Sequence, residues 1–230
     1  MASPAVDVGW FLQLAGGNAA GAYLTEVKAA LEANDRYLWS TRNDSACFGL
    51  HNGTMKTEGN CPPTPTATAA NQHGLLWAEG VADSGEDGST KFCRTQVVDP
   101  TTRKKTWTNC TGVFLSMDVT AYSVDLRRSI ARICTAQGDT AAANTWAAAA
   151  ADLAGKMKAA LWREELGAMY NRYADDSFVT TLVHSNLRMM WLGVSDQKQN
   201  AHRSDTPAWA RKPFFQAPQT AVYFPTPWKP

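Results

Sequence analysis

The sequence lacks two features that would point to a polyanion or a membrane. Its 22 basic and 21 acidic residues leave a formal net charge of +1, so there is no strong positive field to attract nucleic acid or an anionic lipid surface. No apolar run reaches the roughly 20 residues that a membrane helix needs. The alanine-rich stretch Ala147 to Ala151 is short and lies between Trp146 and Asp152. We therefore predict a soluble protein that does not bind nucleic acid and has no membrane-spanning segment.

Several motifs of well-defined chemistry are also absent. The histidines lack the paired spacing of a metal-binding helix, and the five cysteines contain no C-x-x-C pair. There is no G-x-S-x-G turn to present a nucleophilic serine. The glycines of residues 16–21 have the wrong spacing for a dinucleotide-binding loop, and we interpret them as a helix boundary. The sequence thus predicts neither a metal nor an organic cofactor.

An export signal is missing, although other features suggest export. The N-terminal residues carry no basic segment followed by an apolar core. Glycosylation triplets nevertheless begin at Asn43, Asn52 and Asn109. Together with the loop cysteines they predict a glycoprotein of the secretory pathway or extracellular space, whose true start lies further upstream. The alternative is that the triplets occur by chance and the cysteines are reduced.

The positions of the cysteines predict how they pair. Four of the five lie in the loop-rich part of the chain, and the fifth, Cys134, lies on the apolar face of an expected helix. We expect a disulfide between Cys47 and Cys61 and a second one between Cys93 and Cys110. Cys134 should remain a buried thiol.

Helical periodicity is the strongest structural signal. Apolar residues recur at helical spacing over about 19–39, 116–137 and 140–162. The first of these helices is expected to end or be interrupted near Asn34-Asp35, whereas the second and third should pack antiparallel because their connection is very short. Weaker patterns predict a short helix over 8–14, a helix or turn over 74–82, an extended segment over 169–173 and a helix over 182–194.

The remaining segments are predicted to be loops. Residues 40–70 are rich in Thr, Asn, Gly and Pro, which favours a long loop without regular elements. Its two cysteines are expected to hold this loop in place. Residues 92–109, with the basic triplet Arg103-Lys104-Lys105, are typical of a solvated excursion, and the proline-rich tail from about 207 cannot stay helical. We expect one domain over 1–230 with an all-α fold of helical hairpins and decorated loops.

The segment that points to a chemistry is the acidic loop of residues 83–89. Glycoside hydrolysis needs one protonated and one ionised carboxyl group, and Asp87 is the best candidate for the acid. Gly85 and Gly88 on its two sides allow the backbone to approach a ligand closely. The neighbouring Asp83 and Glu86 would favour the protonated form of Asp87 by repulsion between like charges. The same pattern alone also fits an acidic surface turn.

Four blocks of sequence, taken in order, resemble a known enzyme family. They are residues 37–44 (YLWSTRND), 84–89 (SGEDGS), 117–122 (MDVTAY) and 161–170 (LWREELGAMY). This order is similar to that of the six-hairpin (α/α)6 glycosidases that include trehalase and the processing α-glucosidase, a mannosyl-oligosaccharide glucosidase. The resemblance covers about 24–194, and only the Ser-Gly-x-Asp-x-Ser block is specific. It implies part of an (α/α)6 toroid and an inverting mechanism.

The resemblance also implies roles for individual residues. Asp87 matches the general acid, and Ser84, Gly85 and Ser89 match its supporting loop. Arg42 matches the arginine on the substrate side, and Asp118 matches the acid that opens the next helix. Asp83 stands where the family has Glu, so its contact with a sugar hydroxyl would need a shift of the backbone. Trp39 and Trp77 are the nearby aromatic side chains expected to contact the sugar.

One departure from the family pattern limits the prediction. The catalytic base of the family is a Glu near the far end of the barrel, and this sequence has no Glu after Glu165. We therefore expect a fragment or degenerate form of an inverting glycoside hydrolase for α-linked glucosides, with an oligosaccharide or disaccharide as substrate. The missing remainder of the barrel would be its partner. The alternatives are a non-catalytic sugar-binding or structural helical module and an incomplete gene model.

Overall fold

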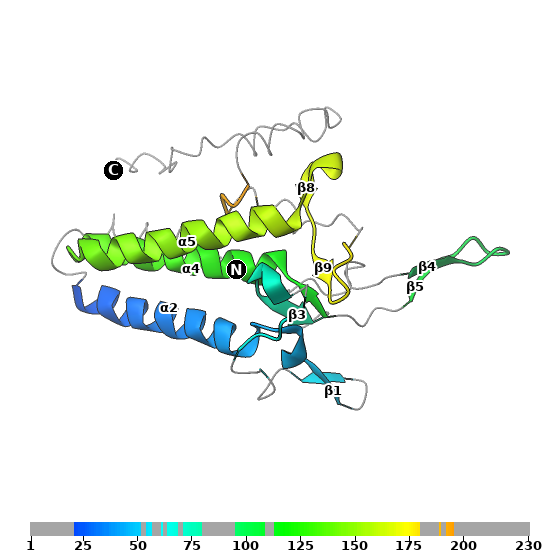
Figure 1. Cartoon of the computed structure of the whole chain (residues 1–230), viewed down its shortest axis with the longest axis horizontal. Coiled ribbons are helices and arrows are strands. Elements are labelled where there is room, and N and C mark those ends of the chain that lie inside the picture. The colour runs from blue at the N-terminus through cyan, green and yellow to red at the C-terminus, as the bar shows by residue number, and fades with distance from the viewer. Residues whose placement is uncertain are drawn as a thin grey trace, which may run out of the picture.

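The computed structural model describes residues 21–51, 54–56, 61, 64–68, 71–79, 95–108, 113–179, 189 and 192–195. This part of the chain is mostly helical. Its long helices are α2 (Gly21–Thr41), α4 (Met117–Ala136) and α5 (Thr140–Leu161). Figure 1 shows α4 packed between α2 and α5. The prediction of an all-α fold of packed helix pairs with decorated loops is confirmed, and the arrangement is consistent with part of an (α/α)6 toroid.

The hairpin of α4 and α5 forms as predicted, because both helices are capped by side chains of the sequence itself. Ser116 Oγ accepts a hydrogen bond from the Val119 amide at 3.2 Å, and Asp139 Oδ1 accepts one from Ala142 at 3.0 Å. Gly138 lies between the helices with φ of 79°, a conformation that favours glycine. This short connection brings the two helices side by side in opposite directions.

The apolar faces of α4 and α5 enclose the main core. Leu153, Met157 and Leu161 of α5 are at most 2% exposed and belong to one buried cluster with Met117 and Val124 of α4. A smaller cluster near the other end of the hairpin holds Ile130, Cys134 and Ala143, with Trp146 against it. Cys134 is a buried free thiol, as predicted.

Helix α2 differs from the prediction at its C-terminal half. The helix does not end near Asn34-Asp35 but continues without interruption to Thr41. Asp35 is only 5% exposed and faces α4, where Arg127 and Ser123 bind its carboxylate. A polar residue that looked like a helix stop is therefore part of the interface, because its charge is paired there.

A small antiparallel sheet lies at the N-terminal end of α4. Its strands are β3 (Trp77–Glu79), β6 (Val113–Leu115) and β9 (Arg172–Tyr173), in the order β3-β6-β9. The prediction of a helix or turn over 74–82 is wrong, since residues 77–79 are extended. Successive side chains of β3 point to opposite faces of the sheet and therefore enter different cores. Trp77 belongs to the α4–α5 cluster, whereas Ala78 packs with Phe114 and Tyr173.

The segment 40–70 is only partly irregular. It contains the 3-10 turn η2 (Ser45–Cys47) and the strands β1 (Gly49–His51) and β2 (Thr54–Lys56), and the 3-10 turn η3 (Asn71–His73) follows it. The prediction that no regular element crosses this segment is therefore wrong. A disulfide joins Cys47 to Cys61. This confirms the predicted pairing and the expectation that the cysteines hold the loop in place.

Residues 95–108 form a hairpin of β4 (Thr95–Val98) and β5 (Lys105–Thr108). In Figure 1 it projects from the body of the molecule. Its apolar side chains Val97 and Val98 are 48% and 43% exposed. Asp99 stabilises the tip by accepting hydrogen bonds from the amides of Thr101 and Thr102, both at 2.8 Å. The segment is the predicted solvated excursion, but it is built as a β-hairpin.

After α5 the chain makes a tight turn and enters the sheet. The elements are β7 (Trp162–Arg163), the 3-10 turn η5 (Glu164–Leu166) and β8 (Ala168–Met169), followed by β9, which confirms the extended segment over 169–173. Residues 8–14, most of 182–194, the tail from 207, and both Cys93 and Cys110 lie outside the described residues. Among the helices of the described segments, none is long and apolar enough to span a membrane.

Candidate functional site

Asp118 lies in the first turn of α4, as the resemblance implied. Its side chain is completely buried. Two neighbours fix this helix end: Ser116 caps it, and Asn171 Oδ1 accepts a hydrogen bond from the Met117 amide at 2.8 Å. A carboxylate near a helix N-terminus is stabilised by the helix dipole. The structure therefore provides a rigid helix end that carries a buried acidic group.

Backbone hydrogen bonds bring Arg42 to the same end of the molecule as Asp118. Arg42 directly follows α2, and its carbonyl oxygen accepts a hydrogen bond from the Trp77 amide at 2.8 Å. The neighbouring Leu76 carbonyl accepts one from the Ser116 amide at 2.8 Å. These two bonds connect the end of α2 to β3 and β3 to the start of α4. Three of the predicted site residues, Arg42, Trp77 and Asp118, thus lie on connected elements.

The guanidinium group of Arg42 is partly exposed. Its Nη1 donates to Thr41 Oγ1 at 2.9 Å, and the group lies 5.7 Å from the centre of the Tyr37 ring. Tyr37 itself is 50% exposed. A cation on the surface beside an exposed aromatic ring is able to contact a sugar. That Arg42 binds a substrate stays a prediction.

The acidic loop with Asp83, Ser84, Gly85, Asp87 and Ser89 lies outside the described residues. Its two flanking strands, however, are described: Trp77 pairs with Leu115 and Glu79 pairs with Val113. Residues 80–112 therefore start and end on neighbouring strands, and β6 leads within two residues into α4. The role of Asp87 as general acid stays a prediction, but the anchors of its loop lie beside the helix that carries Asp118.

The two tryptophans predicted to contact the sugar are completely or partly buried. Trp77 is completely buried, so its indole offers no ring face to a ligand in this structure. Trp39 is partly buried, and its Nε1 donates to Ser123 Oγ at 2.9 Å. The Arg127 guanidinium lies 5.1 Å from the centre of the Trp39 ring. The geometry favours a supporting role for both rings behind the site, and direct binding stays a prediction.

The sequence analysis missed the polar network that holds Trp39. Ser123 Oγ, which accepts from Trp39, donates to Asp35 Oδ1 at 2.5 Å, and Arg127 Nε donates to Asp35 Oδ2 at 3.1 Å. Arg127 also donates to the Ala149 carbonyl of α5 at 3.4 Å. The helical spacing did indicate the position of Asp35. It lies four residues after Leu31 and three before Leu38, which places it on the buried face of α2.

Asp44 is a second buried acid near Arg42. It is 0% exposed, and its carboxylate accepts hydrogen bonds from the amides of Ala46, at 2.7 Å, and of Thr66. Burial opposes its ionisation, but these amide hydrogen bonds outweigh burial and hold the pKa of Asp44 below its ordinary value. The ionised side chain therefore fixes the turn that follows Arg42.

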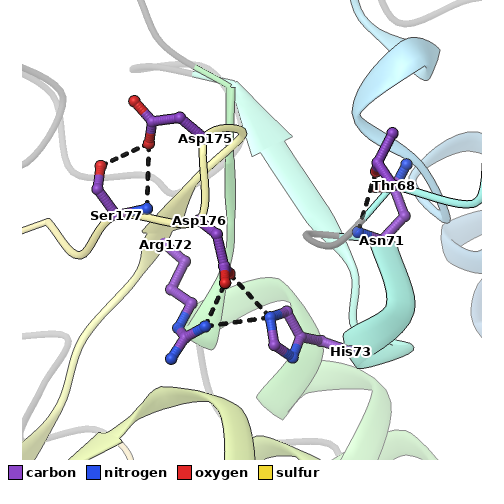
Figure 2. Close-up of polar contacts among 7 residues, drawn as sticks. All are labelled: Thr68, Asn71, His73, Arg172, Asp175, Asp176 and Ser177. Carbon is purple, nitrogen blue, oxygen red and sulfur yellow. Dashed lines mark hydrogen bonds and ion pairs between the residues drawn. The ribbon is translucent and has the colours of Figure 1, made fainter.

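A third acidic centre lies at the β9 edge of the sheet (Figure 2). Asp176 Oδ1 accepts hydrogen bonds from Arg172 Nη1 at 2.7 Å and from His73 Nε2 at 2.8 Å, and these two nitrogens are 3.1 Å apart. Burial raises the pKa of Asp176, but the hydrogen bonds from His73 and Arg172 outweigh it and keep the pKa below its ordinary value. The carboxylate is therefore ionised, and it connects η3 to β9.

Asp175 and Asp176 are the described carboxylates that follow Glu165 in the chain, and both are engaged. Asp175 Oδ1 accepts from the Ser177 amide at 3.1 Å and from Ser177 Oγ at 2.5 Å (Figure 2). Asp176 is held by Arg172 and His73. The hydrogen bonds of these two carboxylates differ from the arrangement expected of a general base, which must accept a hydrogen bond from the attacking water molecule. Within the described segments no group of three or more His, Cys, Asp or Glu side chains is placed to hold a metal ion.

Comparison with known protein families gives one match. The family described as "Mannosylglycerate hydrolase MGH1-like glycoside hydrolase domain" matches residues 8–219. Comparison with curated proteins and with solved structures gave no match. The family match spans the blocks that carry Arg42, Asp87 and Asp118.

Proposed function

The chain belongs to the MGH1-like glycoside hydrolase domain family, and from this membership we propose that it is a degenerate or partial inverting glycosidase domain for α-linked glucosides. The observation that carries the proposal is that the family match includes the acidic loop and both elements that flank it. A carbohydrate is the substrate class that this family implies. The chain would bind its sugar at the N-terminal end of α4, with Asp87 as the general acid.

Each residue has a defined task in this proposal. Asp87 protonates the glycosidic oxygen as the bond to the anomeric carbon breaks. Arg42 binds hydroxyl groups of the sugar, and Asp118, which is completely buried, supports the helix end beneath it. Ser84, Gly85, Ser89 and Asp83 shape the loop around Asp87. Trp39 and Trp77 support this surface from behind. The water molecule that attacks from the opposite side needs a base, and the sequence offers no Glu after Glu165.

A non-catalytic sugar-binding module is the second candidate, and one specific observation favours it. The described acids after Glu165, Asp175 and Asp176, already accept hydrogen bonds from their neighbours. A site with an acid but without an available base would bind a glycoside and release it unchanged. We further propose a secretory or extracellular location, supported by the Cys47–Cys61 disulfide and the glycosylation triplets.

Calorimetric titration of the purified chain tests the binding step. Trehalose, kojibiose and nigerose represent α-linked glucosides, and mannosylglycerate is added because the family name contains it. Binding of an α-glucoside that is lost in Arg42→Ala supports the proposal. Arg103→Ala is the matched control, since Arg103 is an exposed cation on the β4–β5 hairpin. Absence of binding for all three glucosides would contradict the proposed substrate class, and binding of mannosylglycerate alone would replace it.

A further inference from the structure

The glycosylation triplet Asn43-Asp44-Ser45 lies against the disulfide. Asn43 Oδ1 is 3.2 Å from Cys61 Sγ and 3.5 Å from Cys47 Sγ. The Asn43 side chain is half-buried at this place, and Cys47 is completely buried beneath it. The carboxamide group that would carry a glycan therefore contacts the bridge through its oxygen and is only partly exposed.

The other two residues of the triplet are fixed as well. The carboxylate of Asp44 is buried and accepts the amides of Ala46 and Thr66. Ser45 begins η2, and its amide donates to Asn71 Oδ1 at 3.3 Å. Two of these contacts come from residues 66 and 71, which the Cys47–Cys61 bridge holds close to the triplet. The bridge, together with the contacts of Thr66 and Asn71, therefore holds Cys61 and these two residues against the triplet.

We propose that Asn43 can accept an N-linked glycan only before the Cys47–Cys61 disulfide has formed, so that disulfide closure ends modification at this site. In the transfer, Asn43 Nδ2 bonds to C1 of the first sugar of a lipid-diphosphate-linked oligosaccharide. The lipid diphosphate leaves and the amide loses one proton. A glycan is bulky and requires an accessible acceptor, and the transferase must reach both Asn43 and Ser45. The closed turn denies that access.

The order of events is set within a short stretch of chain. Cys61 lies 18 residues after Asn43. In the proposed secretory location, on which this order of events rests, both cysteines would enter an oxidising compartment soon after the triplet. Disulfide formation and glycan transfer to Asn43 therefore compete during the same interval of synthesis. The triplet at Asn109 is separate from this bridge in sequence. Because its middle residue Cys110 is predicted to pair with Cys93, it serves as the internal reference for the cysteine variants, which leave that second pair intact, and not for the reduction with dithiothreitol.

The test is expression of the full chain behind a heterologous signal peptide in a eukaryotic secretory host, followed by mass spectrometry of glycopeptides. In the wild-type chain, occupancy at Asn43 is expected to be low. In Cys47→Ser/Cys61→Ser, occupancy at Asn43 should rise several-fold while occupancy at Asn109 stays constant. Brief reduction of wild-type cells with dithiothreitol during synthesis should raise Asn43 occupancy in the same direction.

Cys134→Ser is the matched control, because it removes a buried cysteine from α4 and leaves the bridge intact. It should leave Asn43 occupancy at the wild-type level even if it weakens the fold. Equal occupancy in the wild type and the double variant, high or low, would overturn the proposal. So would a secreted wild-type chain with a glycan on Asn43 in most molecules and the bridge closed, or an equal rise at Asn43 in Cys134→Ser.

Discussion

Asp35 of α2 and Arg127 of α4 form an ion pair inside the interface of their helices, with Arg127 Nε 3.1 Å from Asp35 Oδ2. Their side chains are 7% and 16% exposed. Ser123 and Trp39 complete the hydrogen bonding around the pair. The carboxylate is thus satisfied on both oxygens, which is the condition under which a buried charge is tolerated.

Asp35→Ala is expected to reduce the free energy of unfolding by about 3–5 kcal/mol, because it leaves the Arg127 charge buried without its partner. Urea unfolding measures the loss. Glu32→Ala is the control: its pairs with Lys28 and Arg36, at 3.7 and 4.0 Å, are long, and the Glu32 side chain is 25% exposed. That variant should lose at most about 1 kcal/mol. Similar losses in both variants would contradict the assigned role of Asp35.

The helices could be predicted from the sequence because their signals are local. Ser116, Gly138 and the apolar spacing between them define α4 without reference to any other part of the chain. The spacing of apolar residues places Asp35 on the buried face of α2, but it does not identify the partner of Asp35, since Arg127 lies 92 residues away. Without that partner, a polar pair such as Asn34-Asp35 resembles a helix boundary.

The small sheet was missed for the same reason. Each of its strands is only two or three residues long, and the cross-strand row of Trp77, Leu115 and Arg172 joins segments far apart in the chain. No alternating pattern can be recognised over so few residues. At the candidate site, the sequence correctly placed Asp118 at the start of a helix, but it gave no sign that Trp77 is completely buried. The binding roles of Arg42 and Asp118 stay predictions.

Leu153→Ala should cost about 2–5 kcal/mol of unfolding free energy, because Leu153 is 2% exposed in the core between α4 and α5. Lys156→Ala, three residues later, should change the stability little, since the Lys156 side chain is 50% exposed and its pair with Asp152 lies on the surface. Thermal unfolding of both variants tests this. Equal effects would mean that the faces of α5 are assigned wrongly.

Peptide mapping without reduction should find Cys47 linked to Cys61 and Cys134 as a free thiol. We also expect Cys93 linked to Cys110. In the entropy model, closing a loop of about 15 residues contributes roughly 3 kcal/mol, so Cys47→Ser/Cys61→Ser should unfold at lower urea concentration. Five free thiols in a chain produced in an oxidising compartment would contradict both pairings and the proposed secretory location.

The ion pair of Asp176 predicts a pH dependence with a defined sign. The pKa of Asp176 is lowered in the folded state from the ordinary value of 3.8. Its contribution to stability is therefore fully present above about pH 3.8 and is lost as the pH falls through the folded-state pKa. The effect should be modest, because the Asp176 side chain is 37% exposed and its charges are screened.

Asp176→Asn isolates this charge, since φ at position 176 is 65° and Asn adopts that conformation readily. Urea midpoints at pH 7 should be lower for the variant than for the wild type, and the difference should shrink at pH 3. Asp152→Asn, with a side chain that is 64% exposed, should show little difference at either pH. A constant difference for Asp176→Asn at both pH values would assign the effect to packing and not to charge.

Finally, the chain alone is expected not to hydrolyse α-glucosides at an enzymatic rate. An inverting site needs a base to activate water on the face opposite the acid, and general-base catalysis typically contributes about 10²–10⁴-fold. The sequence has no Glu after Glu165, and the carboxylates of Asp175 and Asp176 are held by their neighbours. Glucose release from trehalose, kojibiose and nigerose is measured beside Asp87→Asn. If turnover occurs and Asp87→Asn abolishes it, then an aspartate such as Asp176 or Asp205, or a second copy of the chain, supplies the base. The proposal of a degenerate or partial domain would then have to be given up.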